Sequence, residues 1–406
     1  MARKAIPEEN FLTSGIFTFR SYSCKCEEVA VTSNISALPV PGIKCTPDVN
    51  CKINFAFGAK VGLVRLNSDG SVAETNILGK LASMKGDGIS DYSAFFERNG
   101  FLFPIDRPEI IVISDIQFLV DRLRATLELI STITDMSRTS YEKIVRLSFY
   151  HLFAPVVTME TQEGKYKYFS DRHRYSTFLE SRKNAQREAR LNDTFNNSAF
   201  TFKDSVGVFS LDADFVDSVL NGTTVEGKYM NPLFHDVFNA YCTPRDNTPK
   251  DMLLINDFVF HYLYEVGMID YVDLENTHYM DGTYHRECFS DQLKSASVDV
   301  AKYIIKEEIE SNLRRVRPTY DIVKLEPAWK IDSLLSGLYF GLFYMRPNME
   351  IYRRCANPRC GEFFLVPVSS RKKKYCCHAC MNRAMAARKR AKDKIDATRE
   401  KNSDEE

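Results

Sequence analysis

The chain begins with apolar runs that are the length of strands and are interrupted by turn residues. Runs rich in β-branched and aromatic residues lie between Gly, Pro and Asn at positions 15–19, 29–31 and 53–57. Two further runs, at residues 61–66 and 72–75, flank Asp69-Gly70, and an Asp-Gly pair supplies the positive φ of a hairpin turn. This pattern predicts a small sheet in the first part of the chain.

From about residue 91 the apolar positions recur at helical spacing. Ser114 and Gln117 form a capping box ahead of a leucine- and isoleucine-bearing stripe that ends at Ile130. The same reasoning predicts further helices at residues 92–98, 139–153, 181–191, 257–266, 290–315 and 327–345. The helix at 327–345 contains Trp329, and its apolar stretch is about a dozen residues long, whereas a bilayer span needs about 20. We therefore expect it to be buried in the protein.

These patterns predict an α+β protein with a β-rich N-terminal part, a mainly helical middle and a separate C-terminal region. We expect a body over residues 1–348, β-rich over 1–90 and mostly helical over 91–348, for which sensing of a ligand or association are the candidate roles. A boundary is expected at Arg346-Pro347-Asn348, because proline disfavours helix in the residue before it.

Composition is that of a folded chain, with 44% hydrophobic, 27% charged and 12% aromatic residues. The net charge of zero hides an asymmetry: residues 351–406 contain 15 basic and 7 acidic residues, a net of +8, which leaves a net of −8 for residues 1–350. A basic appendage on an acidic body indicates contact with a polyanion, with nucleic acid as the first candidate. The alternative is a solvated basic helix.

The first residues show no secretory signal, since no apolar segment follows Arg3-Lys4. We therefore expect a cytoplasmic protein with no membrane partner. In that setting the eleven cysteines are expected to be thiols or metal ligands rather than disulfides.

Four of the cysteines near the C-terminus have the spacing of a zinc site. Cys355 and Cys360 form a C-x4-C pair, and after fifteen intervening residues Cys376 and Cys380 form a C-x3-C pair. Two close thiolate pairs with a short excursion between them suit a tetrahedral, closed structural zinc site better than an iron site. Cys377 or His378 could replace a neighbouring ligand, and four buried thiols without metal are the alternative to the whole interpretation.

The residues around these pairs predict a treble-clef-like finger. Asn357-Pro358 would form a knuckle turn, residues 362–366 and 372–375 would pair as a hairpin, and the second cysteine pair would open a helix that runs to about residue 394. By analogy with zinc-finger peptides, the metal would contribute on the order of 10 kcal/mol to folding. We expect the finger to span residues 349–395 and residues 396–406 to be a disordered tail.

Residues 354–390 resemble the CGNR zinc finger. The resemblance rests on Cys-Ala-Asn-Pro-Arg-Cys at 355–360, on the aromatic residues Phe364 and Tyr375, and on Cys380-Met381-Asn382-Arg383. Met381 stands where the family has glycine, and Val366-Pro367 stands where an acidic residue is common. Residues 92–129 weakly resemble the ABATE-type domain that accompanies this finger. The resemblance implies a bacterial transcription regulator.

Basic residues surround the predicted finger and suggest what it binds. We expect Arg371, Lys372, Lys373 and Lys374 at the hairpin tip, and Arg383, Arg388, Arg390 and Lys394 along the following helix, where Arg383, Arg390 and Lys394 share one face. Such a surface would follow phosphates, with DNA as the expected partner and RNA as the second candidate. Asn382 would brace a sulfur from outside the ligand set, or would be an exposed helix residue.

The resulting hypothesis is a zinc-dependent nucleic-acid-binding protein that regulates transcription. Its alternatives are a protein-interaction protein with a purely structural finger, and an enzyme with an unrecognised site in the helical body. No catalytic residue can be assigned, because no P-loop, G-x-S-x-G, HExxH or dinucleotide motif is present. An effector and a homo-oligomeric state are left open.

Two further groups of polar residues carry weaker signals. The loop that contains His278, Asp281, His285, Glu287 and Cys288 has irregular spacing and is interpreted as polar surface rather than as a metal or hydrolytic site. Near the start of the chain stand Cys24, Cys26, Cys45 and Cys51, whose spacing is not a standard zinc pattern. Strand alternation places Cys24 and Cys26 on one face, and buried thiols are favoured there over metal or redox chemistry.

Overall fold

A computed structural model gives the fold. It describes residues 16–31, 39–58, 61–84, 88–135, 140–153, 157–160, 167–169, 174–191, 200–221, 229, 231–243, 245, 248–322, 325–346, 350–370 and 372–403.

The chain divides into two compact units, each assembled from separate segments. The first, which we call the sheet unit, contains residues 1–134, 157–168 and 312–406, and the second, the helical unit, contains residues 135–156 and 169–311. This division differs from the boundary expected near residue 348, since the chain on both sides of that position belongs to the sheet unit. Pro347 and Asn348 themselves lie outside the described residues.

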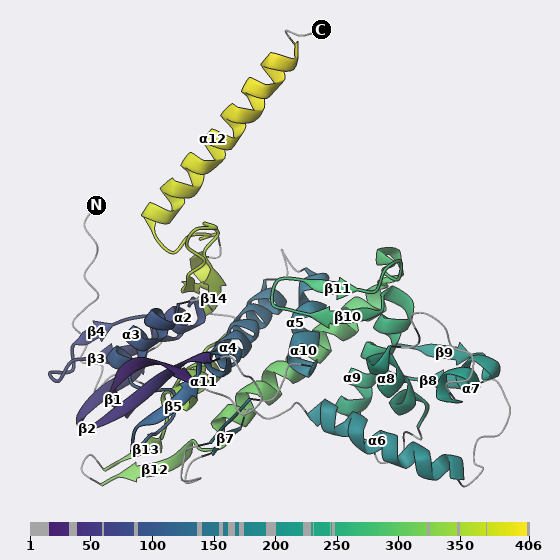
Figure 1. The fold of residues 1–406 in the computed structure, drawn as a ribbon, viewed down its shortest axis with the longest axis horizontal. Coiled ribbons are helices and arrows are strands. Elements are labelled where there is room, and N and C mark those ends of the chain that lie inside the picture. Colours follow the sequence, from purple (N-terminus) through teal and green to yellow (C-terminus); the bar gives the residue numbers. More distant parts are fainter. Residues whose placement is uncertain are drawn as a thin grey trace. The chain divides into compact units, whose positions relative to one another are not determined.

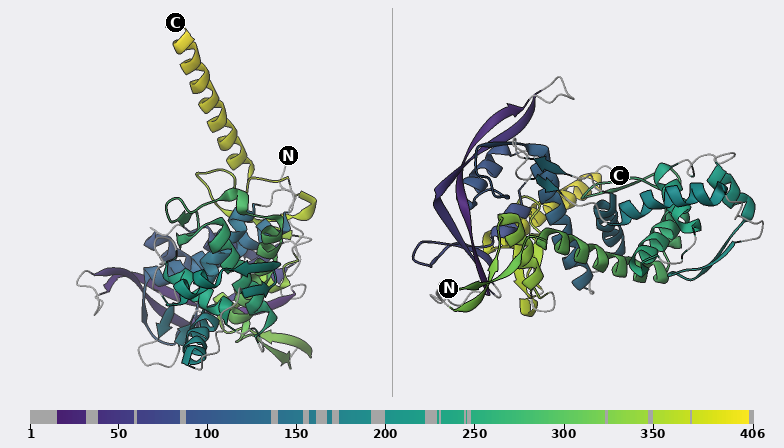
Figure 2. Two further views of the ribbon diagram at one scale, coloured as in Figure 1. Left: turned by 90° about the vertical axis from the view of Figure 1, so that its right-hand side faces the viewer. Right: turned by 90° about the horizontal axis from the view of Figure 1, so that it is seen from below.

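The sheet unit is built on an antiparallel sheet in which β2 is central (Figure 1). β2 pairs with β1 along most of its length, with β3 near one end and with β5 near the other. The strands are β1 (Phe17–Val31), β2 (Val40–Gly58), β3 (Gly62–Leu66), β4 (Val72–Glu74) and β5 (Glu109–Val112). Figure 2 shows the long strands β1 and β2 side by side.

Three helices and an aromatic cluster pack on this sheet. The helices are α2 (Ile77–Ala82), α3 (Ile89–Asn99) and α4 (Ile113–Thr134), and α3 packs against β1. On α11 (Leu334–Tyr344), the ring of Phe340 packs at a tilt against Phe17 on β1, with 4.7 Å between the ring centroids, and the Tyr344 centroid lies 5.7 Å from that of Phe17. Gly337 allows this close approach, because a Cβ there would lie 2.3 Å from the Phe19 ring.

The helical unit is a group of helices with two short hairpins. Its helices are α5 (Tyr141–Phe153), α6 (Arg174–Leu191), α7 (Ala213–Asn221), α8 (Pro232–Cys242), α9 (Lys250–His261) and most of α10 (Asp291–Leu313). Its hairpins are β8–β9 (Phe200–Lys203, Val208–Leu211) and β10–β11 (Ile269–Val272, Thr277–Tyr279), and it also contains the π-helix η3 (Tyr262–Val266) and the 3-10 turn η4 (Arg286–Cys288). A further short pair, β6 (Thr158–Glu160) and β7 (Lys167–Phe169), lies in the sheet unit except for Phe169.

The predicted fold class is confirmed: an N-terminal sheet precedes a mainly helical middle, and a cysteine cluster lies near the C-terminus. The Asp69-Gly70 hairpin joins β3 and β4, with Gly70 at φ +86°. α3 ends at Asn99, and Gly100 follows at φ +80° and ψ 165°; glycine adopts this positive φ without strain, but it is not the left-handed cap that Asn-Gly predicts. No helix among the described residues is both long enough and apolar enough to cross a membrane.

The helix predicted over residues 327–345 is wrong in its first part. Residues 326–330 form β13 (Glu326–Lys330), which pairs with β12 (Arg317–Asp321), and α11 begins only at Leu334. Trp329 therefore lies on a strand, where its ring packs 5.0 Å from that of Phe340. Pro327 suggested the start of a helix, but proline is equally tolerated on an edge strand.

Candidate metal centre

The finger begins with a hairpin that frames the first cysteine pair. β14 (Glu350–Arg354) pairs antiparallel with β15 (Phe363–Pro367), and Arg354 stands opposite Phe363. The predicted pairing of residues 362–366 with residues 372–375 is therefore wrong. Ile351 and Tyr352 on β14 are buried. Residues 372–374 are instead three exposed lysines, which have no apolar side chain to pack in a hairpin.

The loop between these strands is the knuckle that Asn357-Pro358 predicted. The Cys355 N–H donates to Glu362 O at 2.8 Å, and the Cys360 N–H donates to Asn357 O at 2.9 Å. Gly361 follows at φ +64°, a conformation that glycine adopts without strain. The Ala356 N–H donates to Lys374 O at 2.8 Å, so the segment that carries the second cysteine pair is fastened to the knuckle.

The four predicted ligands come together. The Sγ atoms of Cys355, Cys360, Cys376 and Cys380 all lie within 4.8 Å of one another, with 3.7 Å between Cys360 and Cys376 and 3.6 Å between Cys376 and Cys380. A Zn–S bond of about 2.3 Å gives a tetrahedron with edges of about 3.8 Å. Two sulfurs in van der Waals contact have a similar separation, so the informative feature is that four sulfurs gather in one group.

The two neighbouring donors that could have replaced a ligand remain outside this group. Cys377 is exposed, although its Sγ lies 3.9 Å from that of Cys376, and His378 is exposed at the start of α12 (His378–Ser403). In contrast, Cys355 and Cys380 are each only 5% exposed. The structure thus brings together the C-x4-C and C-x3-C set that the spacing predicts. Four thiolates close such a site, so it can hold a metal but leaves no open position for substrate.

The surroundings of the cluster favour ionised thiols at two of the four positions. Burial acts to raise the pKa of Cys355, but hydrogen bonds from the backbone N–H groups of Cys376 and Asn357 lower it overall. The Asn357 side chain lowers the pKa of Cys380, which also lies in the first turn of α12, where the helix dipole favours negative charge. Burial raises the pKa of Cys376 and Cys360.

Asn357 belongs to the knuckle turn, as its sequence position predicts, but its side chain also acts on the cysteine cluster. Its side chain is 4% exposed, and its Oδ1 accepts a hydrogen bond from the Arg359 N–H at 3.3 Å. Its buried Nδ2 has no hydrogen-bond partner among the described residues, and the Asn357 side chain lowers the pKa of Cys380. Asn382, which was expected to brace a sulfur, is exposed on α12.

The finger hairpin is attached to the sheet unit through a second set of contacts. Asn76 Nδ2 donates to Phe363 O at 2.8 Å, and the Phe363 N–H donates to Ser83 Oγ at 2.7 Å. These two bonds satisfy both main-chain groups of Phe363 from the two ends of α2. Gly79 lies between them, and a Cβ there would be 2.3 Å from Phe363 O. β14 also packs against α4.

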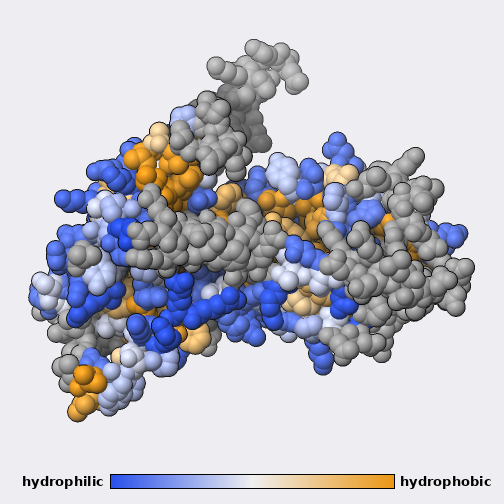
Figure 3. All heavy atoms as spheres, turned by 60° about the horizontal axis from the view of Figure 1, so that its bottom comes forward, coloured by the Kyte–Doolittle hydropathy of each residue, from blue (hydrophilic) through white to orange (hydrophobic). Residues whose placement is uncertain are grey.

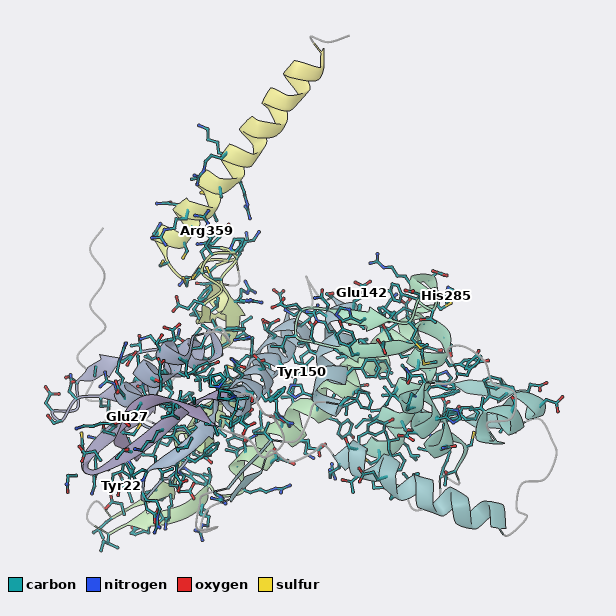
Figure 4. All side chains as sticks on the ribbon, viewed as in Figure 1. Tyr22, Glu27, Glu142, Tyr150, His285 and Arg359 are labelled. Carbon is teal, nitrogen blue, oxygen red and sulfur yellow. The ribbon has the colours of Figure 1, made fainter. Side chains whose placement is uncertain are left out.

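The basic residues of the finger occupy two exposed segments. The loop that leads to α12, rather than a hairpin tip, contains Lys372, Lys373 and Lys374. Its main chain is held by the Arg353 side chain, whose Nη1 donates to Lys373 O at 3.2 Å. Lys373 Nζ lies 5.2 Å from the centroid of the Phe364 ring. Arg371 is outside the described residues. Arg359 is exposed in the knuckle, where Figure 4 labels it.

The helix α12 carries the second basic segment. Arg383, Arg388, Lys389 and Arg390 are exposed, whereas Ala384 is buried against the finger. The side chain of Lys394 lies outside the described residues. α12 continues to Ser403, so residues 396–403 are helical and the expectation of a disordered tail is wrong for them; residues 404–406 are not described.

The helical unit contains a buried charged network that could be mistaken for an active site. His261 Nε2 lies 2.8 Å from Asp204 Oδ2 and its Nδ1 lies 2.5 Å from Glu265 Oε1, while Arg245 binds Asp257 through both guanidinium nitrogens. The side chains of His261, Asp204 and Asp257 are 3%, 0% and 0% exposed. The partners of His261, Asp204 and Asp257 account for the burial of these three charged side chains.

Two further sets of polar residues in the helical unit have local partners. Asp212 Oδ1 accepts from the N–H groups of Asp214 and Phe215 at the start of α7, which explains the Asp-x-Asp spacing as a helix cap. His285 lies beside Glu287, and Arg286 pairs with Glu142 at 3.0 Å (Figure 4 labels His285 and Glu142). Within the described residues His278, His285 and Cys288 do not gather into a group that could hold a metal.

Comparisons with protein-family models, curated proteins and solved structures find no match to this chain.

Proposed function

We propose that this protein is a zinc-binding, nucleic-acid-binding protein whose C-terminal finger contacts DNA in transcription regulation. The observation that carries the proposal is the four-sulfur cluster of Cys355, Cys360, Cys376 and Cys380 at the base of a basic helix. Zinc is the preferred ion because four thiolates in one closed group match its tetrahedral structural sites. An iron–sulfur cluster would need room for sulfide between the cysteines, and sulfurs 3.6 and 3.7 Å apart leave none.

The basic residues support DNA as the partner because they are exposed and held in place. Between His378 and Arg390 the helix has four Lys or Arg residues and no acidic residue, and its first turn is anchored by Cys380. The loop at residues 372–374 is fastened to the knuckle and to Arg353. Because the main chain that carries these charges is held, the backbone needs little reordering when the side chains contact phosphates.

The resemblance to the CGNR finger also supports DNA binding. It contributes the expectation of a bacterial regulator, in which the remaining part of the chain senses an effector or mediates association. Phosphate contacts alone confer affinity without sequence preference. The basic residues named above therefore account for binding, while the choice of operator depends on contacts to base edges.

Binding of duplex DNA across a salt series tests the proposal. If about six basic residues contact phosphates, log affinity should fall with log salt at a slope of about −5, from about −0.9 per contact. Arg383→Ala with Arg390→Ala should make the slope shallower by about two units. The matched control is Lys302→Ala with Lys306→Ala, two exposed lysines on α10, which should leave the slope unchanged. Wild-type protein with a slope near zero would overturn DNA binding.

A purely structural finger is the second candidate function, and one observation favours it. The hydrogen bonds of Phe363 to Asn76 and Ser83 attach the finger hairpin to α2, so the metal would also stabilise this attachment. A protein-interaction role would use exposed apolar surface; Figure 3 shows hydrophobic residues in separate patches on a mainly hydrophilic face. Zinc binding without salt-dependent DNA binding would identify this role.

A further inference from the structure

A second group of cysteine sulfurs lies in the N-terminal sheet. Cys24 and Cys26 are on β1, and Cys45 is on β2 directly opposite Cys26. The Cys24 and Cys26 sulfurs are 3.8 Å apart, those of Cys26 and Cys45 are 3.7 Å apart, and all three lie within 4.8 Å of one another. The neighbouring Glu27, labelled in Figure 4, marks this part of β1.

Strand geometry explains how residues so spaced in the sequence meet. Residues two apart on one strand share a face, and residues directly opposite on paired strands also share a face. Cys24, Cys26 and Cys45 therefore form a triangle on one side of the β1–β2 ladder. Its separations match those within the finger cluster, where sulfurs are 3.6 and 3.7 Å apart, and they fit the edge of about 3.8 Å around a zinc ion.

The site is enclosed by α3, which packs on β1. Cys24 is 3% exposed and Cys45 is 0% exposed, whereas Cys26 is half-buried and offers a route for entry. The Cys24 thiol donates to Phe96 O on α3 at 3.3 Å, and the Cys26 N–H donates to Glu97 Oε1 at 3.2 Å. The sulfurs are thus held by a strand pair and a helix rather than by a loop.

A buried carboxylate on the strand next to Cys45 is a second observation at this part of the sheet. Glu109 on β5 stands directly opposite Cys45, so its side chain leaves the sheet on the same face. It is 4% exposed, and its buried Oε1 has no hydrogen-bond partner among the described residues. Leaving such an oxygen without a partner in the interior is costly. The Glu109 carboxylate lies outside the group of three sulfurs within 4.8 Å of one another, so its side chain would have to turn toward them to bind an ion held there.

We propose that Cys24, Cys26 and Cys45 form a second thiolate metal centre, which binds one zinc ion, and that the Glu109 side chain turns toward the ion as its fourth ligand. Three sulfurs and one carboxylate oxygen are a donor set that zinc accepts. The four ligands bring the same total charge as the four thiolates of the finger. Since β1, β2 and β5 each supply a ligand, the ion would fasten both neighbours of β2, and α3 shields it from solvent.

The alternative is three packed thiols, two of which could oxidise to a disulfide across the strand pair. Packed thiols would leave Glu109 Oε1 without a partner, and a Cys26–Cys45 disulfide would remove two ligands at once. Both alternatives predict that the sheet binds no metal, so a count of metal ions in the whole protein separates them from the proposal.

Elemental analysis of the full-length protein, purified under reducing conditions and saturated with zinc, tests the inference. We expect two zinc ions per chain. Cys26→Ser should reduce this to one, and it is the least disruptive choice because Cys26 is the half-buried member. Cys360→Ser with Cys376→Ser should also reduce it to one, since the sheet centre does not depend on the finger. Cys51→Ser, an exposed cysteine on β2, is the matched control and should retain two.

Cobalt substitution measured on the same variants identifies the ligands. In the finger double variant, the remaining Co(II) should show sulfur-to-metal charge-transfer absorption that is lost on Cys45→Ser, and Glu109→Gln should weaken binding by about 10-fold or more. Circular dichroism confirms that each variant is folded. One zinc per wild-type chain, a count unchanged by Cys26→Ser, or a Cys26–Cys45 disulfide in the purified protein would overturn the centre. Unchanged affinity in Glu109→Gln would overturn the fourth ligand.

Discussion

Asn76 Nδ2 donates a hydrogen bond to the main-chain oxygen of Phe363, 287 positions later in the chain. Asn76 has φ +60°, a left-handed conformation that asparagine tolerates better than most residues. It precedes α2, and Ser83 at the other end of α2 accepts the N–H of Phe363. The residues at both ends of α2 therefore hold β15, the strand that follows the knuckle. The cysteine cluster is thus supported by α2 of the sheet unit as well as by its own loops.

Removing this contact should destabilise the protein without removing the ligands. Asn76→Ala loses a hydrogen bond and forces alanine into a left-handed conformation, so we expect about 2–3 kcal/mol of lost stability. Asn76→Gly keeps the conformation and loses only the bond, for which we expect about 1 kcal/mol. Urea unfolding of the zinc-loaded protein measures both values. Equal losses in the two variants would show that the conformation contributes nothing.

The sequence predicted the parts of this site that depend on local spacing. The ligand set follows from C-x4-C and C-x3-C, and the knuckle follows from Asn357-Pro358. The partner of β15 was assigned wrongly, because pairing with β14 rather than with residues 372–375 depends on which strand can bury apolar side chains against α2 and α4. The support from Asn76 could not be predicted, since no local pattern links positions so far apart.

The lengths of β1 and β2 also could not be predicted from local sequence patterns. β1 and β2 contain 15 and 19 residues, whereas the sequence suggested only short runs within them, because Lys, Asp, Asn and Pro interrupt the apolar pattern. Pairing with a neighbour extends a strand through such residues when main-chain hydrogen bonds are available. The register also decides that Cys45 lies opposite Cys26 and Glu109. Sequence spacing alone left these cysteines as loose pairs.

Loss of one finger ligand should release the metal. Cys376→Ser leaves three thiolates, and we expect zinc affinity to fall by several orders of magnitude, because the metal supplies on the order of 10 kcal/mol to such a site. Competition with a chromogenic chelator measures the change. Cys377→Ser is the matched control, since Cys377 is adjacent but exposed. A loss of affinity in Cys377→Ser equal to that in Cys376→Ser would contradict the ligand assignment.

Asn357 should tune the cluster from outside the ligand set. Its buried amide acts on the Cys380 sulfur, so Asn357→Ala should weaken zinc binding by about 10- to 100-fold. Asn357→Asp should weaken it further, since a carboxylate would repel the Cys380 thiolate. The control is Asn382→Ala, an exposed residue on α12, which should bind zinc as the wild type does. Chelator competition on all three variants measures the effect, and a wild-type affinity for Asn357→Ala would exclude the bracing role.

The histidine network of the helical unit should make stability depend on pH. Burial acts to lower the pKa of His261, but its hydrogen bonds to Asp204 and Glu265 outweigh burial and raise the pKa to about 9, from 6.5. The folded state therefore binds the proton more tightly than the unfolded state. The resulting stabilisation is fully present below pH 6.5 and is lost as the pH rises through 9.

This stabilisation is on the order of 3–4 kcal/mol, since one pKa unit corresponds to about 1.4 kcal/mol. His261→Gln should be less stable than the wild type at pH 6, and the difference should shrink by about that amount by pH 9.5. Urea unfolding at a series of pH values measures it, and subtracting the two curves removes the titration of thiols that both proteins share. His278→Gln, on the partly exposed strand β11, is the control. A difference between His261→Gln and the wild type that stays constant from pH 6 to 9.5 would show that His261 is not charged in the folded protein.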